Sequence, residues 1–343
     1  MSPRVVIGAP VFGKAEYLRL ALDSLLAQTY EDFALVVIDD RSEDDTAAVA
    51  AEYAARDPRV LVHVNERRLG MLENTREAFL RARRLFPEAE YWALGSDHDL
   101  WEPAWLETVV AELDAHPEAV MAYGRSDRID EHGQAYQRAK PPWRFETAGL
   151  TDSRARLRSA FRGMVAGDMI YALFRVSAFE QVGPYQAVLV PDRLLLSELA
   201  LHGEFRQADA LLWHRRFRGL ADLDRQRRAF WPAGQPAYAR LPWWLTHVGA
   251  FAYAYAIQGK GEPLGIGRAR GARLAVDYLE VSVRHRLWRR RRRIKNLGLR
   301  TRDAVLGPPV KAALRSERVR RLALDHVVPR LRATEETLER LTR

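Results

Sequence analysis

The 343-residue chain has no cysteine, which excludes disulfide scaffolds, thiolate nucleophiles and thiolate metal sites and fits a reducing compartment. It also lacks an apolar stretch of membrane-spanning length: residues 241–257 form a largely apolar run of 17, whereas a spanning helix needs about 20. A proline, a histidine and a glycine interrupt this run. We therefore expect a buried or interfacial helix there, with Trp243 and Trp244 at a lipid boundary. No apolar segment of signal length follows the N-terminus, so a cleaved export signal is not expected.

Charge is distributed unevenly along the chain. Residues 241–343 hold 23 Lys and Arg against 9 Asp and Glu, whereas residues 1–240 hold 31 against 36. We predict two domains, an acidic body at 1–240 and a basic helical extension at 241–343. Hydrophobic residues make up 48% of the chain, enough for a packed core. The basic extension favours an anionic partner, either a phospholipid surface or a nucleic acid.

Short β-branched runs alternate with amphipathic segments over the first 125 residues. The runs predict strands, and the helical spacing of apolar residues between them predicts helices. The expected strands are 5–9, 35–38, 60–64 and 91–94, and the expected helices are 15–28, 47–55, 71–85 and one that opens at Pro103. This alternation is typical of an α/β fold with a mostly parallel central sheet flanked by helices. Ligands of such sheets bind at the carboxyl ends of the strands.

Acidic residues follow the second and fourth expected strands and open a later segment. They are Asp39-Asp40, Asp97-His98-Asp99 and Asp192. Carboxylates gathered at one crevice repel one another unless a cation offsets their charge. A hard divalent ion such as Mg²⁺ or Mn²⁺, bridging to a nucleotide diphosphate, is the simplest such cation. Taken alone, each cluster is more typical of a helix cap or a solvated turn.

Five short motifs stand in a fixed order along the body. They are Pro10-Val11-Phe12-Gly13, the segment 24–30 (SLLAQTY), the segment 37–46 (VIDDRSEDDT), Asp97-His98-Asp99, and Asp192 followed by Leu195 and Gly203. In this order and spacing the chain resembles the family 2 glycosyltransferases of the GT-A fold, over residues 5–217. The resemblance implies a GT-A fold for the body.

The resemblance also implies a reaction and a set of site residues. It implies a nucleotide-diphosphate sugar donor of the UDP or GDP type, a hydroxyl acceptor on a cell-envelope or lipid-linked glycan, and a Mg²⁺ or Mn²⁺ cofactor. Asp192 would be the general base of an inverting transfer and take the proton of the acceptor hydroxyl. The residues implied to bind the nucleotide sugar are Pro10, Phe12, Asp40, Arg68 and Asp97. Those implied to hold the metal are Asp97, His98, Asp99 and His214.

Two positions depart from the family pattern, and three assignments have simpler alternatives. His98 stands where the family commonly has an acid, and an imidazole shifts the preference toward Mn²⁺. Pro191 stands before the base, where Glu is common. The alternatives are a helix N-cap for Asp192, a solvated loop charge for Arg68 and a surface histidine for His214.

Two other functions compete with glycosyl transfer. A sugar-phosphate nucleotidyltransferase usually carries a glycine-rich basic loop after its first strand, and Ala9 to Lys14 does not supply one. A catalytically silent binding protein would keep the fold without turnover. The presence of Asp192 and of both acids in the second cluster favours an enzyme.

The densest charge lies in the extension, where the arginines of Arg284–Arg293 surround Leu287 and Trp288. Such a cluster favours anionic lipid headgroups, at about 1 kcal/mol for each charge at the surface. A solvated helix face that contacts the acidic body is an equal alternative. Nucleic acid is not expected, because no nucleic-acid motif accompanies the cluster. We expect a cytoplasmic protein, with the inner face of the membrane as the surface that this cluster would reach.

Overall fold

The computed structural model describes residues 2–135, 144–216 and 222–305, with the side chains of Arg286 and of 288–305 outside that description. The chain consists of two compact units, Met1–Ser282 and Val283–Arg343. The expected division into domains at residue 240 stays a prediction. The sheet, the three cores and the candidate site described below lie in the first unit, whereas the helix Arg268–Val305 continues into the second.

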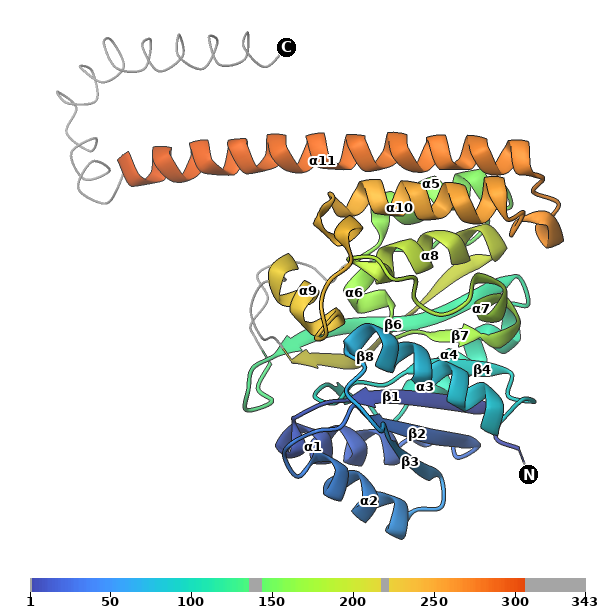
Figure 1. The fold of residues 1–343 in the computed structure, drawn as a ribbon, viewed down its shortest axis with the longest axis vertical. Coiled ribbons are helices and arrows are strands. Elements are labelled where there is room, and N and C mark those ends of the chain that lie inside the picture. Colours follow the sequence, from blue (N-terminus) through green and yellow to red (C-terminus); the bar gives the residue numbers. More distant parts are fainter. Residues whose placement is uncertain (1, 136–143, 217–221, 306–343) are drawn as a thin grey trace, which may run out of the picture. The chain divides into compact units, whose positions relative to one another are not determined.

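An eight-stranded sheet forms the centre of the first unit (Figure 1). Its strands are β1 (Val5–Val11), β2 (Phe33–Asp39), β3 (Val60–Val64), β4 (Tyr91–Leu94), β5 (Leu100–Trp101), β6 (Ala119–Ile129), β7 (Leu173–Arg175) and β8 (Glu204–Arg216). The strand order is β3-β2-β1-β4-β7-β6-β8-β5. β1 to β4 run parallel to one another and β6 runs parallel to β8, whereas β7 is antiparallel to both of its neighbours and β5 is antiparallel to β8. The prediction of a mostly parallel α/β sheet is confirmed.

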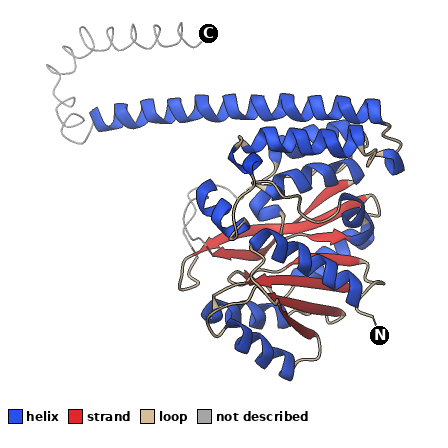
Figure 2. Cartoon of the chain, in the orientation of Figure 1, coloured by secondary structure: helices blue, strands red, loops and turns tan. Residues whose placement is uncertain are grey.

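Helices cover both faces of this sheet (Figure 2). One face packs against α1 (Ala15–Leu26), α2 (Thr46–Arg56) and α4 (Trp105–Ala115). The other packs against α3 (Met71–Leu85), α6 (Ala166–Met169), α7 (Val176–Val182) and α8 (Pro191–His202). The alternation of the strands explains the two layers: Val5 and Ile7 of β1 enter the first core, and Val6 enters the second. Because both faces are covered, the strands read as continuous apolar runs.

A third core joins α10 (Trp243–Ala252), its π-helical continuation (Tyr253–Ile257) and α11 (Arg268–Val305) to the body. α9 (Leu223–Phe230) instead inserts Phe230 into the core on the α3 face of the sheet. Short 3₁₀ turns lie at Ala237–Arg240 and Glu262–Leu264. Phe251, Tyr255 and Tyr278 pack against apolar residues of α8 and of α5 (Ser153–Gly163). One side of the run 241–257 is therefore buried, as the sequence predicts.

The helix formed by this run is too short and too interrupted to span a membrane, and the same test applies to the other helices. None of the helices in the described part of the chain combines the length and the apolar character needed to cross a bilayer.

A glycine in the central strand lets the sheet and an aromatic ring approach each other closely. A Cβ built at Gly8 would lie 2.0 Å from an atom of the buried Trp92 ring. We expect Gly8→Ala to lower the free energy of unfolding by about 3 kcal/mol, because a packed core cannot move the indole aside without strain. Urea unfolding measures the loss. Gly267→Ala is the control, since nothing lies within 4 Å of its Cβ; equal effects of the two substitutions would contradict the prediction.

Candidate active site

The carboxyl ends of β1, β2 and β4 meet at one edge of the sheet. Residues 10–14, 39–42 and 95–99 follow these ends. The end of β8 reaches the same edge, because the backbone N–H of Arg216 donates to Asp99 at 2.8 Å and its guanidinium donates to the His98 carbonyl at 2.9 Å. The acidic cluster is thus fixed between the first half of the sheet and its last long strand.

Asp97 lies at the centre of a small network of charges. Lys14 Nζ donates to its two carboxylate oxygens at 2.7 and 2.9 Å, and His98 Nδ1 also contacts the carboxylate. Burial favours the neutral acid, but the positive charge of Lys14 and the His98 hydrogen bond outweigh this effect and hold the Asp97 pKa well below its usual range. Asp97 is therefore an anion whose neutralising cation is a residue of the chain itself.

His98 and Asp99 form the pair that fits a divalent cation best. His98 Nε2 lies 3.7 Å from Asp99 Oδ1, and the other ring nitrogen faces Asp97 and Ser96. An imidazole nitrogen beside a carboxylate oxygen suits Mn²⁺. Among the described residues no group of three or more His, Asp or Glu could hold a metal ion by itself. The pair supplies two ligands at most, so a metal role for His98 and Asp99 stays a prediction.

His214 is placed differently from the other expected metal ligands. Its two ring nitrogens contact Asp127 Oδ1 at 2.7 Å and Glu102 Oε1 at 2.6 Å. Burial opposes the charged imidazole, but the two carboxylates outweigh burial and raise the His214 pKa. A metal would have to displace one of these carboxylates, so a metal role for His214 stays a prediction.

Asp40 organises the loop that leads into α3. Its buried carboxylate accepts hydrogen bonds from the backbone N–H groups of Leu69 (2.6 Å) and Gly70 (2.8 Å) and from the Asn65 side chain (3.1 Å). A carboxylate accepts about four hydrogen bonds, so little capacity is left for a nucleotide base. The base-binding role of Asp40 stays a prediction. In the structure its carboxylate holds the loop at Leu69 and Gly70 in place.

The same loop brings Arg68 to the end of β1. The Arg68 guanidinium lies over the Phe12 ring, 4.0 Å from its centroid. This cation–π contact places a positive charge beside the turn that begins at Pro10. Arg68 is exposed to solvent, so the solvated loop charge and the phosphate-binding role both stay open as predictions.

Asp192 occupies the first turn of α8, and it does not cap the helix. The N-cap is Val190, in the left-handed region at φ 56°, and its side chain makes no capping bond. The Tyr185 hydroxyl donates to Asp192 Oδ1 at 2.6 Å. Burial raises the Asp192 pKa, and the Tyr185 hydrogen bond and the charge of Arg215 act against this rise. A carboxyl with a raised pKa and one strong donor is suited to accept a proton.

Arg215 and Tyr171 connect Asp192 with the acidic cluster. The charge of Arg215 acts on the pKa values of both Asp99 and Asp192. The pKa of Tyr171 is raised first by burial and then by the negative charges of these two acids. Such mutual effects require short separations. Asp99 and Asp192 therefore both lie within the electrostatic influence of Arg215 and Tyr171, and their sharing of one site stays a prediction.

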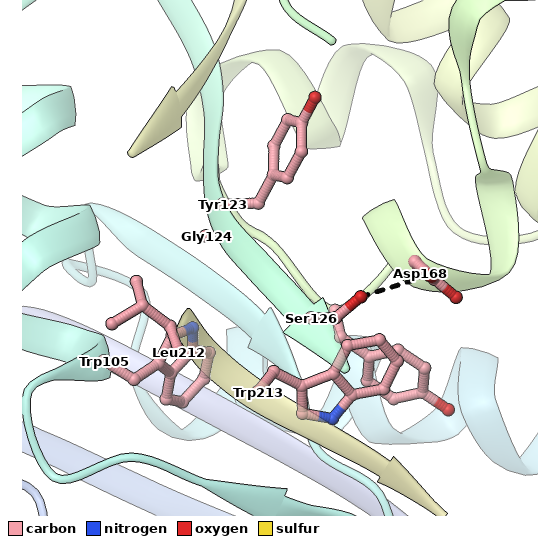
Figure 3. A pocket seen from close by; sticks show the side chains of 8 residues that line it. Trp105, Tyr123, Gly124, Ser126, Asp168, Leu212 and Trp213 are labelled. Carbon is pink, nitrogen blue, oxygen red and sulfur yellow. Dashed lines mark hydrogen bonds between the residues drawn. The ribbon is translucent and has the colours of Figure 1, made fainter. Parts of the chain in front are cut away.

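A pocket opens beside this region (Figure 3). It has a cavity volume of only about 30 Å³ and is lined by Trp105, Tyr123, Gly124, Ser126, Asp168, Tyr171, Leu212 and Trp213. Asp168 accepts hydrogen bonds from Arg128 and Arg215 at 2.7 Å and from Ser126 at 3.1 Å. A cavity of this size has room for about one or two water molecules and not for a nucleotide sugar.

Four residues that shape the site are absent from the predicted set: Lys14, Asp168, Tyr185 and Arg215. Lys14 directly follows the turn at Pro10, and its position beside a strand end was a usable signal. The other three carry no sequence signal, because only the tertiary fold brings them to the acids.

The comparisons with known proteins agree with this geometry. The model of glycosyl transferase family 2 matches residues 6–183, more than half of the chain. The chain therefore belongs to glycosyl transferase family 2.

Individual relatives match over parts of their length. An uncharacterized glycosyltransferase of Rickettsia felis is 28% identical over 192 residues, which is 54% of this chain and 29% of the relative. The uncharacterized protein y4gI of Sinorhizobium fredii is 34% identical over 145 residues, 41% of this chain and 15% of the relative. The chain thus spans well under two thirds of these relatives.

Solved structures show the fold. TarS of S. aureus, residues 1–349, aligns with a TM-score of 0.50 and 14% identity over 83% of this chain and 91% of that one. The same protein in complex with UDP aligns with a TM-score of 0.50 and 15% identity over 81% of this chain and 80% of that one. The chain has the GT-A fold.

The hydrogen bond from Tyr185 to Asp192 predicts a pH effect. The hydroxyl favours the ionised carboxylate, so Tyr185→Phe raises the Asp192 pKa further. Because a general base must be ionised, the acidic limb of the pH profile of kcat/KM should move to higher pH, with activity recovered in more alkaline buffer. Tyr53→Phe is the matched control, since Tyr53 donates to Asp23 at 2.6 Å far from the site. An unmoved limb in Tyr185→Phe would refute the assignment.

Proposed function

We propose that the chain is a metal-dependent inverting glycosyltransferase. It would move a sugar from a UDP- or GDP-type donor to a hydroxyl of a cell-envelope or lipid-linked glycan. The observation that supports the proposal is the environment of Asp192, a buried carboxyl at the start of α8 that has a raised pKa and accepts a hydrogen bond from Tyr185 at 2.6 Å. The structure of TarS with UDP, a protein of the same fold, supports a nucleotide diphosphate as the leaving group.

The residues of the chain divide the chemistry between them. The acceptor oxygen attacks the anomeric carbon, its proton passes to an Asp192 carboxylate oxygen, and the bond from the anomeric carbon to the diphosphate oxygen breaks. One catalytic carboxylate is enough, because the nucleotide diphosphate is already a good leaving group. Tyr185 holds the Asp192 side chain and, with Arg215, favours its ionised form before the proton arrives.

Positive charge for the departing diphosphate comes from several sources. Lys14 and Arg68 lie at the end of β1, paired with Asp97 and stacked on Phe12, and Arg215 is paired with Asp168. His98 and Asp99 would hold Mg²⁺ or Mn²⁺, which when bound neutralises diphosphate charge in the transition state. Asp97 and Lys14 would fix the orientation of the His98 ring next to that ion.

A panel of UDP-, GDP- and dTDP-sugars with Mn²⁺ or Mg²⁺ tests the proposal. We expect one donor to yield nucleoside diphosphate, at a rate that a hydroxyl acceptor increases and a chelator removes. Release of pyrophosphate from a nucleotide triphosphate and a sugar phosphate would instead identify a nucleotidyltransferase. Donor binding without any turnover, over the whole panel and with acceptor glycans, would identify a silent binding protein.

The basic cluster Arg284–Arg293 adds a second proposal on location. Its charge density supports attraction to the anionic inner face of the membrane. Binding to anionic vesicles should fall steeply with salt and with removal of residues 284–293. Binding that ignores both changes would count against this electrostatic attachment and favour contact with the acidic body.

A further inference from the structure

A row of exposed apolar residues without charge runs from Leu241, an extended residue before α10, over the outer side of α10 and into the π-helical turn that follows it. The row consists of Leu241, Leu245, Gly249, Tyr253 and Ile257, four residues apart throughout. The four side chains are 50%, 41%, 57% and 62% exposed, in chain order. Within residues 241–257 the one titratable side chain besides tyrosine is His247, which is buried. Burial holds the His247 pKa at about 4, so it carries no charge at neutral pH.

The helix geometry keeps this row on one side. Residues four apart drift by about 40° around an ideal α-helix. The π-helical turn Tyr253–Ile257 has more residues per turn, so residues four apart drift in the opposite direction there and the two drifts offset each other. The opposite side of the same segment, with Phe251 and Tyr255, is fully buried in the third core. The segment is therefore apolar on both sides, with one side packed in the third core and the other exposed to water.

The exposed area of the row favours a lipid bilayer over a second copy of the chain as its partner. Its exposed side-chain surface is roughly 400 Å², about half of what each partner buries in a stable protein interface. A second copy of the chain would thus need much more contact than the row offers. A lipid bilayer needs no matching surface and takes up individual apolar side chains at the headgroup boundary.

The surroundings of the row also suit a bilayer. Exposed Arg240 precedes Leu241, and exposed Arg273 lies on α11 in the stretch that packs against the buried side of α10. Arginine beside an apolar row can bind lipid phosphates while its stem lies along the apolar surface. Tyr253 has the amphipathic ring that favours membrane–water interfaces.

We propose that the apolar row of α10 is a bilayer-contact surface, which inserts Leu241, Leu245, Tyr253 and Ile257 into the headgroup–acyl boundary of a phospholipid membrane. This surface belongs to the first compact unit, whereas the cluster Arg284–Arg293 belongs to the second. The surface would act by apolar insertion and the cluster by charge. The inference does not require the transfer reaction proposed above. If the acceptor is lipid-linked, the same surface would hold the enzyme at the membrane that contains it.

Flotation of the full chain with vesicles tests the proposal. We expect binding to neutral phosphatidylcholine vesicles that persists at high salt and falls about tenfold in the double variant Leu245→Glu, Ile257→Glu. The matched control is Leu20→Glu on α1, whose side chain is 49% exposed but has no such row around it. Binding to phosphatidylglycerol vesicles alone, abolished by salt, would assign attachment to the arginine cluster and overturn the role of the row. A dimer in light scattering that the double variant dissociates would make the row an interface between copies.

A labelling measurement keeps the test independent of the folding of the charged variant. Because the chain has no cysteine, Ile257→Cys introduces a single thiol for an environment-sensitive fluorophore. We expect a blue shift on addition of neutral vesicles for a label at residue 257 and none for a label in Leu20→Cys. An unshifted label at residue 257 would overturn the proposal. Nucleoside diphosphate release by the same labelled proteins reports on the transfer reaction separately.

Discussion

Asp192→Asn should lower kcat for glycosyl transfer by about 10³-fold. The amide is nearly isosteric and can still accept the Tyr185 hydrogen bond, so the site keeps its shape. It cannot take a proton from the acceptor hydroxyl. Donor affinity should be unchanged, because the carboxylate acts on the acceptor side. Steady-state kinetics with the best donor of the panel, together with calorimetric binding of the nucleotide diphosphate, measure both quantities.

The matched control for this substitution is Asp209→Asn, an exposed acid on β8 that pairs with Arg125 at 3.4 Å. We expect wild-type kinetics from it. Wild-type turnover by Asp192→Asn would rule out Asp192 as the base. An equal loss of activity and of thermal stability would assign Asp192 a structural role instead.

Asp99→Asn should raise the Mn²⁺ concentration for half-maximal activity by about 10- to 100-fold and lower kcat at fixed metal. The buried carboxylate contributes the negative charge next to His98 Nε2, 3.7 Å away. An asparagine oxygen can still accept the hydrogen bond of the Arg216 backbone N–H, so the end of β8 should stay in place. Metal titration of the reaction rate, with a melting curve for each variant, separates metal loss from unfolding.

Asp127→Asn provides the comparison for the metal assignment. It removes a carboxylate from His214 and leaves His98 and Asp99 intact. We expect an unchanged metal requirement. A larger effect from Asp127→Asn than from Asp99→Asn would move the cation toward His214 and contradict the assignment to the pair His98 and Asp99.

The parts of the site that follow strands could be predicted from the sequence. Asp40 and Asp99 come directly after buried runs, and the rule that parallel strands end at one edge places them together. Local sequence also predicts that Asp192 opens a helix, but not that Val190 takes the N-cap position. The partners of the acids could not be predicted. Tyr185 and Arg215 reach them from a loop and from the last long strand, through packing that has no local pattern.

The C-terminal segment shows a different limit of sequence reasoning. The sequence predicts that the run 241–257 is either buried or interfacial. In the structure one side of this segment is buried and the other is exposed: Phe251 is buried, whereas Leu245 is exposed. Periodicity detects the apolar character of such a helix, but a helix that is apolar all round does not reveal which side has a partner. The third core decides this, because it fills one side only.

α8 links the chemistry to the far end of the first unit. Its first turn holds Asp192, and its Leu194 and Leu201 pack against Phe251 and Tyr278 in the third core. Truncation of the chain after residue 240 would expose this side of α8 to water. Asp192, the proposed proton acceptor, would then lose the packing that holds its helix, although all the strand ends would remain. Under the proposed mechanism, turnover should therefore respond to changes among the buried aromatic residues of the third core, although these lie apart from the strand ends.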